Sequence, residues 1–211
     1  MVRRTLAISI LLLAVAGCGD AQAKPEDENI YRAKNGVFSC PMPSLAEPGA
    51  RTDEHFLENA FMVAFSDDFG QLVRIDGERA NAPVPDQQEV LEEVLNNIFE
   101  GMSLPAFRQA APTTAVLGRS FQSDFHDGAL LVVVSLPGGS SISRSTDGGK
   151  LERLDALRSA LLFFEGGWFF QVSVQLPPVV GENSPPGSPE AVERLNTLTF
   201  DFANSMDIHP N

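Results

Sequence analysis

Three histidines and two cysteines are the side chains best suited to acid–base or nucleophilic chemistry near neutral pH. They are His55, His126, His209, Cys18 and Cys40. The sequence contains no serine nucleophile elbow, no zinc-binding H-E-x-x-H and no Walker phosphate loop. His209 lies in the terminal tail, where a solvated side chain is expected. The sequence therefore predicts a protein that is not an enzyme and that holds no metal or other cofactor.

Carboxylates gather in two expected turns. Asp67 and Asp68 mark one turn, and His126 lies between Asp124 and Asp127 in the other. Such oxygens suit Ca²⁺, but neither turn has the ligand spacing of an EF-hand. Aspartate commonly hydrogen-bonds the backbone of its own turn. We therefore predict that these carboxylates shape turns, with a calcium site as the alternative.

Two further motifs favour structural interpretations. The Gly138–Ser141 stretch superficially suggests a phosphate cradle, but it lacks the lysine and the following helix that such a loop needs. We expect a flexible hairpin loop there. Glu54, His55 and Glu58 have the spacing of neighbours on a solvated helical turn.

Cys40 lies in an apolar run, two residues after Phe38. The two-residue period of a strand places both side chains on one face. No C-x-x-C motif and no nearby cationic cluster would lower the pKa of the thiol. We therefore predict a buried cysteine, with a redox-active or intermolecular thiol as the alternative.

The N-terminus has the organisation of a secretion signal. Arg3 and Arg4 precede an aliphatic run from Leu6 to Ala16, which is too short to span a bilayer. The run ends in Val15-Ala16-Gly17-Cys18, which resembles the lipobox of bacterial lipoproteins. This resemblance implies cleavage between Gly17 and Cys18, and a diacylglyceryl group with palmitate-type acyl chains on the Cys18 thiol.

A second possible cleavage site leaves the lipidation of Cys18 open. Ala21-Gln22-Ala23 fits an A-x-A motif, and cleavage after Ala23 would release a soluble periplasmic protein. With lipidation, Gly19 after the cysteine favours the outer membrane of a Gram-negative cell, with the domain facing the periplasm. We expect a signal peptide over 1–17, a lipidated cysteine and flexible acidic tether over 18–33, and one domain over 34–211.

The net charge of the 211 residues is −13, from 15 Lys and Arg and 28 Asp and Glu. Loss of Arg3 and Arg4 with the signal peptide would make it −15. This acidity excludes a nucleic-acid footprint, which needs a basic face. Twelve acidic and two basic residues lie between Thr52 and Glu100. They form either a solvated face or a docking surface for a basic partner; the candidate residues are Asp86, Glu89, Glu92 and Glu93.

The body alternates strand and helix patterns. We predict strands over 36–41, 61–65, 71–76, 113–125, 129–136, 157–165 and 168–176, and helices over 86–101 and 188–206. Short connections favour antiparallel pairing. The predicted fold class is α+β, with one antiparallel sheet of six or seven strands layered by two main helices in an α-β-α sandwich.

Several details of these elements can be tested. Asp86 and Glu89 form a variant of the capping box, and Gly101 is the expected end of the first helix. The leucines of 151–162 also fit a helix, although the double-glycine turn after Glu165 favours a hairpin. Ser188 and Pro189 predict the start of the last helix. Its expected inner face is Val192, Leu195, Leu198, Phe202 and Met206.

The Asn35–Pro41 segment, the order of elements and the Phe163–Phe169 hairpin resemble the PsbP-type α-β-α sandwich. That superfamily also holds a eukaryotic Ran-binding nuclear import factor. The resemblance implies adaptor work rather than catalysis, and it carries over no binding residue.

The expected function is that of a lipid-anchored cell-envelope protein, acting as an adaptor or accessory subunit that binds a protein partner. The alternative is a periplasmic module that binds a small ligand with the loops 137–150 and 177–187.

Overall fold

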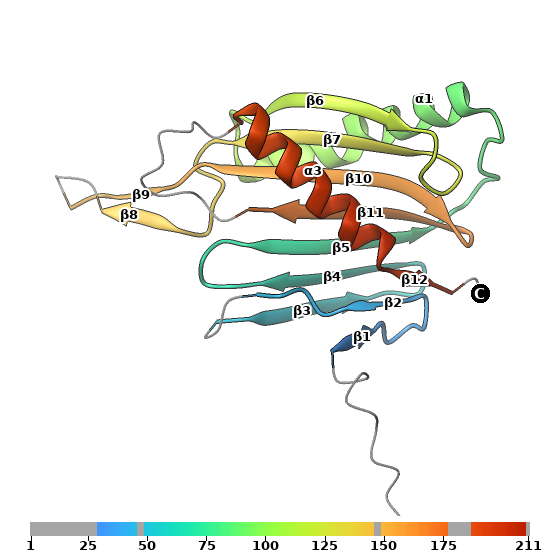
Figure 1. The fold of residues 1–211 in the computed structure, drawn as a ribbon, viewed down its shortest axis with the longest axis horizontal. Helices are drawn as coiled ribbons and strands as arrows, with labels where there is room; N and C mark the ends of the chain where they lie inside the picture. The colour runs from blue at the N-terminus through green and yellow to red at the C-terminus, as the bar shows by residue number, and fades with distance from the viewer. Residues whose placement is uncertain (1–28, 46–48, 146–148, 177–186, 210–211) are drawn as a thin grey trace, which may run out of the picture.

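The computed structural model describes residues 29–45, 49–145, 149–176 and 187–209. A seven-stranded sheet is its central layer (Figure 1). All neighbouring strands in it are antiparallel, which confirms the predicted pairing. The prediction of one sheet is wrong in part, because the predicted strand over 36–41 pairs outside this sheet, in a smaller one. In spatial order the strands are β3 (Arg51–Phe56), β4 (Ala60–Ser66), β5 (Leu72–Arg79), β11 (Trp168–Gln175), β10 (Ala156–Glu165), β7 (Ala129–Leu136) and β6 (Ala115–Gln122).

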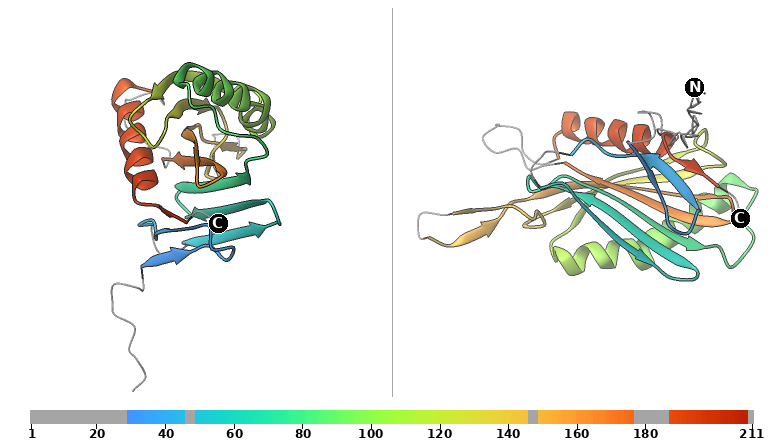
Figure 2. Two further views of the ribbon diagram at one scale, coloured as in Figure 1. Left: turned by 90° about the vertical axis from the view of Figure 1, so that its right-hand side faces the viewer. Right: turned by 90° about the horizontal axis from the view of Figure 1, so that it is seen from below.

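Helices lie on both faces of this sheet, as predicted (Figure 2). On one face, α1 (Gln88–Ile98) continues through the π-helical turn η2 (Phe99–Ser103) into α2 (Leu104–Ala110). On the other face lies α3 (Pro189–Asn204), which contacts β10 and β11. No helix among the described residues is long and apolar enough to cross a membrane.

Two smaller sheets complete the architecture. The strands β1 (Ile30–Arg32) and β12 (Asp207–Ile208) both pair with β2 (Phe38–Pro41), on the α3 side. The short strands β8 (Ser143–Ser145) and β9 (Leu151–Arg153) form a hairpin that projects from the body (Figure 1).

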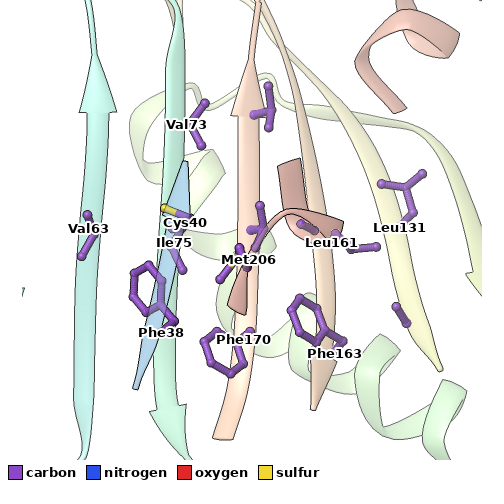
Figure 3. Packing of buried hydrophobic residues seen from close by; sticks show 14 of the residues in the cluster. Phe38, Cys40, Val63, Val73, Ile75, Leu131, Leu161, Phe163, Phe170 and Met206 are labelled. Carbon is purple, nitrogen blue, oxygen red and sulfur yellow. The ribbon is translucent and has the colours of Figure 1, made fainter. Parts of the chain in front are cut away.

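The main sheet separates two hydrophobic cores. Alternate residues of each strand point to opposite faces, so β7, whose Ala129–Val134 stretch is buried throughout, contributes to both cores. One core joins the sheet to α3 and β2; in Figure 3, Phe38 and Cys40 lie over Val63 and Ile75. The other joins β7 and β10 to α1, η2 and α2.

The start of α3 follows the prediction. The Ser188 hydroxyl accepts a hydrogen bond from the Ala191 amide at 3.2 Å, and Pro189 takes the first helical position. The inner face differs in one respect. Leu195 is buried together with Thr199 and Ala203, whereas the predicted Leu198 is 38% exposed.

The first helix departs from the prediction at both ends. It begins at Gln88 with Gln87 as the N-cap and no side-chain cap, so the capping box of Asp86 and Glu89 is wrong. Asp86 lies one residue too early to cap this first turn. Gly101 does not end the helix, because the buried Leu104 and Phe107 extend its apolar anchoring along the sheet.

Three segments differ from the sequence-based expectation. Residues 30–33, expected in the tether, contain β1 and the buried Ala33. The edge strand β3 was not predicted, because its sequence Arg-Thr-Asp-Glu-His-Phe lacks apolar alternation. The 137–150 loop contains β8, and residues 151–162 are extended in β9 and β10 rather than helical.

Candidate functional site

The predicted acidic surface lies on the outer side of α1. Asp86, Glu89, Glu92 and Glu93 are all exposed, because Leu91, Leu95 and Phe99 on the opposite side enter the core. Among the described residues, none of these four carboxylates is within ion-pairing distance of a cation. They therefore form an uncompensated patch of negative charge, which we call the α1 acidic face.

Glu100, at the end of the same helical segment, is compensated. Its carboxylate pairs with Arg119 on β6, and the Arg119 guanidinium also donates to the Asn96 side chain at 3.2 Å. Arg119 further lies 5.0 Å from the ring centroid of Phe99. These contacts bind the helix to the sheet edge, and Arg119 pairs with Glu100 rather than with a carboxylate of the α1 acidic face.

Beside α1 and α2, the sheet continues without a helical cover (Figure 2). The side chains of β3, β4, β5 and β11 that point to this side are more polar than those pointing to the α3 side. Strand register places His55, Met62, Asp76 and Gln171 in one row across it. We call this uncovered side of β3, β4, β5 and β11 the open half-sheet. It lies on the same side of the molecule as the α1 acidic face.

Arg158 on β10 marks the boundary between the covered and open halves. It shares its side of β10 with Ala156, Ala160 and Leu162, which are buried against the helices. Its guanidinium lies over the Phe107 ring of α2, 5.6 Å from the centroid. Burial lowers the pKa of Arg158 to about 10; the charge of Arg74 adds to this shift and that of Asp76 opposes it.

Gln175 is the hydrogen-bond partner of Arg158. Its amide oxygen accepts from Nε at 3.2 Å and from Nη2 at 2.7 Å. The orientation of this amide is fixed, because its nitrogen donates to the Gly70 carbonyl at 2.8 Å. In the described part of the chain, no carboxylate is within ion-pairing distance of the Arg158 guanidinium. Sequence reasoning missed this residue, although a charge on the apolar side of a strand was a usable signal.

Arg74, also on the open half-sheet, is neutralised. Asp76 accepts from its Nε at 3.0 and 2.8 Å and from Nη2 at 2.6 Å. The two arginines thus differ. Arg74 forms a salt bridge with the Asp76 carboxylate, whereas the described hydrogen bonds of the Arg158 guanidinium go to the amide oxygen of Gln175.

Of the turn carboxylates, Asp67 bonds the backbone of its own turn as the sequence predicts, whereas Asp68 and Asp124 bond to side chains. Asp67 is buried, and its Oδ1 accepts from the amides of Phe69 and Gln71, both at 2.9 Å. Asp68 pairs with Arg51, and Asp124 accepts from the Ser123 hydroxyl at 3.0 Å. Within the residues described, no three His, Cys, Asp or Glu side chains gather as metal ligands.

The histidines lie apart from one another. His55 lies on the exposed edge strand β3, not on the predicted helical turn, because the β3–β4 pairing holds this segment extended. His126 has a φ of +48°, and its Nδ1 is 2.9 Å from the Glu165 carboxylate. His209 is exposed near the C-terminal end. No serine or cysteine of the described ranges hydrogen-bonds to a histidine, so they contain no nucleophile–base pair.

The glycine–serine stretch of 138–141 is committed to local structure. The Gly138 amide donates to Asp155 at 2.9 Å, and the buried Ser140 accepts from the Ile142 amide at 3.1 Å. Cys40 is buried, as predicted, and burial raises the pKa of its thiol to about 12. The predicted lipidation site, Cys18 after Gly17, lies outside the described residues.

Two hollows on the surface are small and open. One, of about 310 Å³, is lined by Phe121, Gln122, Ser123, Asp124, Phe125, Phe200 and Asn204. The other, of about 260 Å³, is lined by Ala80, Asn81, Ala82, Pro83, Val84, Pro85, Val94 and Phe164. No described residue of the loops 137–150 and 177–187, which were expected to bind a small ligand, lines either hollow. Residues 146–148 and 177–186 of these loops lie outside the described part.

No protein-family model and no curated protein matches the sequence. Among solved structures, the chain is similar to the Ran-binding protein Mog1p of Saccharomyces cerevisiae, with 11% identity and a TM-score of 0.47. That match covers 85% of this chain and 94% of Mog1p. A structure from Bacteroides thetaiotaomicron matches with 12% identity and a TM-score of 0.41, covering 86% of this chain and 48% of that one.

These similarities correct the PsbP-type resemblance expected from the sequence. The solved structures named above are Mog1p and a Bacteroides protein, and neither is a PsbP-type protein by its description. The expectation rested on the Asn35–Pro41 segment, the element order and one hairpin, and on no chemical motif; unrelated sheets flanked by helices also share such an order of elements.

Proposed function

We propose that this chain is a lipid-anchored protein of the cell envelope whose domain binds a protein partner through the α1 acidic face. The partner would present a basic surface. The observation that carries the proposal is the set of four exposed carboxylates, Asp86, Glu89, Glu92 and Glu93, which form no ion pair within the described chain.

Their arrangement favours association with a basic partner. Like charges one helical turn apart repel one another by a few tenths of a kcal/mol per pair, so Glu89 and Glu93 together do not stabilise α1. A cationic partner would relieve this repulsion and would be steered toward the patch. Glu100, at the end of the same helical segment, pairs with Arg119. The lack of an ion pair therefore distinguishes the α1 acidic face from the acidic residue next to it.

The membrane anchor is supported by the sequence alone. A basic start, a short aliphatic run and the Val15–Cys18 motif are the pattern of a lipoprotein signal. Acylation would keep the domain at the membrane surface, because two or more acyl chains give stable attachment. Changing Cys18 to Ala should move the protein from the membrane fraction to the soluble fraction. An unchanged membrane fraction would reject the anchor.

Binding without catalysis fits the described chemistry. The histidines are separated, Ser140 bonds to its own loop, and Cys40 is buried with a raised pKa. The hollows are small and open, whereas one whole side of the molecule combines the α1 acidic face with the open half-sheet.

The test is capture of a partner from detergent-solubilised envelope of the host bacterium. Glu89, Glu92 and Glu93 would be changed to Lys together, and the matched control would reverse Glu190, Glu193 and Asp201, which are exposed on α3. We expect one stoichiometric partner whose capture weakens with salt and is lost only in the α1 variant. Equal capture by both variants would reject the α1 acidic face as the binding surface.

A further inference from the structure

Arg158 carries a charge that has no carboxylate within ion-pairing distance among the described residues. A guanidinium has five N–H donors in a planar fork, and the described hydrogen bonds use two of its nitrogens on one oxygen of Gln175. Removing a charge from water is costly unless an opposite charge compensates for it. The amide of Gln175 supplies a dipole but no negative charge.

The surroundings hold this guanidinium in place. Phe107 lies over it, and the Gly70 carbonyl fixes the Gln175 amide that accepts its hydrogen bonds. Gln175 is 3% exposed, so its side chain has no room to rotate away. A pre-oriented donor loses less entropy when it binds a ligand than a free surface arginine does.

The site remains accessible from the open half-sheet. Arg158 is only half-buried, and its neighbours toward β5 are Gln175 and Leu72 rather than a helix. Arg74 lies on the same face and adds a second positive charge, although Asp76 neutralises it. A carboxylate arriving over β5 would therefore meet Arg74, which pairs with Asp76, and Arg158, which has no carboxylate within ion-pairing distance in the described chain.

We infer that Arg158 is a binding site for the carboxylate of an aspartate or glutamate side chain on a protein partner that covers the open half-sheet. The inference rests on the proposed function, since the same partner would contact the α1 acidic face on the same side of the molecule. Such a partner needs basic residues opposite α1 and an acidic residue opposite Arg158. This mixed pattern of charges would fix the position of the partner on the surface as well as attract it.

The geometry favours a carboxylate over other acceptors. A carboxylate has two oxygens whose spacing matches two parallel N–H bonds of a guanidinium, and such charge-assisted bonds are about twice as strong as neutral ones. Binding would also neutralise a charge whose hydrogen bonds in the described chain go to a neutral amide. Lysine in place of Arg158 would keep a positive charge but lose the fork.

The test uses the unaltered full-length chain in detergent micelles and a capped tetraglutamate peptide as the probe. The Arg158 Nε–H resonance can be identified by its nuclear Overhauser contact to the Phe107 ring. At about 0.15 M salt the Debye length is about 8 Å, which screens the overall negative charge of the protein. We expect this resonance to shift in a saturable way with tetraglutamate, but not with capped tetraglutamine, and the Arg74 resonance to shift less.

Two outcomes would overturn the inference: no shift of the Arg158 resonance with tetraglutamate, or an equal shift with tetraglutamine. A second measurement uses Arg158→Lys, which we expect to weaken tetraglutamate binding about tenfold, or about 1.4 kcal/mol. Unchanged binding by a folded Arg158→Lys protein would also overturn it. Neither result affects capture of a partner through α1, so failure of this site and failure of the proposed function are distinguishable.

Discussion

The hydroxyl of Thr199 on α3 meets the hydroxyl of Ser159 on β10 inside the core. Both side chains are fully buried. Each also has a backbone acceptor: Thr199 donates to the Leu195 carbonyl at 2.7 Å, and Ser159 lies 3.3 Å from the Val174 carbonyl. This polar contact fixes the position of α3 along the sheet among otherwise apolar neighbours.

The first prediction concerns this pair. Thr199→Val should lower the free energy of unfolding by about 1 kcal/mol, because the Ser159 hydroxyl loses a buried partner. Ser159→Ala should have a similar effect, and a double-mutant cycle should give a coupling of about 0.5–1 kcal/mol. Urea denaturation measures all three. The control is Thr197→Val, an exposed position with the same bond to its own helix, which should change stability by less than about 0.5 kcal/mol.

The second prediction concerns Gln175. Gln175→Leu should lower the free energy of unfolding by about 2–3 kcal/mol, since it leaves both the Gly70 carbonyl and the Arg158 guanidinium without their partner. Gln109→Leu, on the exposed side of α2, is the matched control and should have little effect. If the two variants were equally stable, the role given to Gln175 in holding Arg158 would be wrong.

The third prediction concerns His126, whose backbone is left-handed with a φ of +48°. Its ring is stacked on Phe163, with 5.1 Å between centroids and an interplanar angle of 5°. His126→Val should lower the free energy of unfolding by about 2–3 kcal/mol, from backbone strain and lost stacking. His126→Asn should lower it by about 1 kcal/mol, because asparagine tolerates this conformation. Equal losses in thermal or urea unfolding would refute the contribution of strain.

The fourth prediction concerns pH and Cys40. Its pKa is about 12 in the fold and about 8.5 in an unfolded chain, so only the unfolded chain loses the thiol proton just above pH 8.5. The stabilising effect of the neutral thiol is therefore complete below pH 8.5 and is lost as the pH rises toward 12.

The measurement compares unfolding at pH 7.5 and pH 9.5 in a Cys18→Ser background. The free energy of unfolding should fall by about 1 kcal/mol more with Cys40 present than in a Cys40→Ala variant. The cavity that alanine leaves lowers the free energy of unfolding at both pH values, so its effect cancels when the changes between the two pH values are compared. Identical pH dependence in the two proteins would contradict burial of the thiol in solution.

Strong local patterns made much of the fold predictable. The alternation around Val172 and Val174, the double-glycine turn after Glu165 and the Ser188–Pro189 start each have one low-energy local solution, and the structure contains all three. The edge strand β3 has no such signal, since its pairing with β4 holds it extended. Gly101 failed as a helix end because tertiary burial of Leu104 and Phe107 outweighs the low helix propensity of one glycine.

The candidate site was predictable only in part. Exposure of the acidic residues on α1 follows from helical periodicity, so Glu89, Glu92 and Glu93 were found. Arg158 depends on which segments lie above and beside it, and its neighbours Phe107 and Gln175 are distant in sequence. Their proximity arises from strand register and from the continuation of α1 into α2, which the sequence did not indicate.

The central claim, binding of a protein partner through the α1 acidic face, is tested most directly by site-specific photocrosslinking in living cells. A photoreactive amino acid would replace Glu92 in one strain and Glu193, on the opposite side, in another. We predict one discrete crosslinked protein from position 92 and none from position 193, with the product lost when Glu89 and Glu93 are changed to Lys. The same products from both positions, or no product from position 92, would contradict the claim.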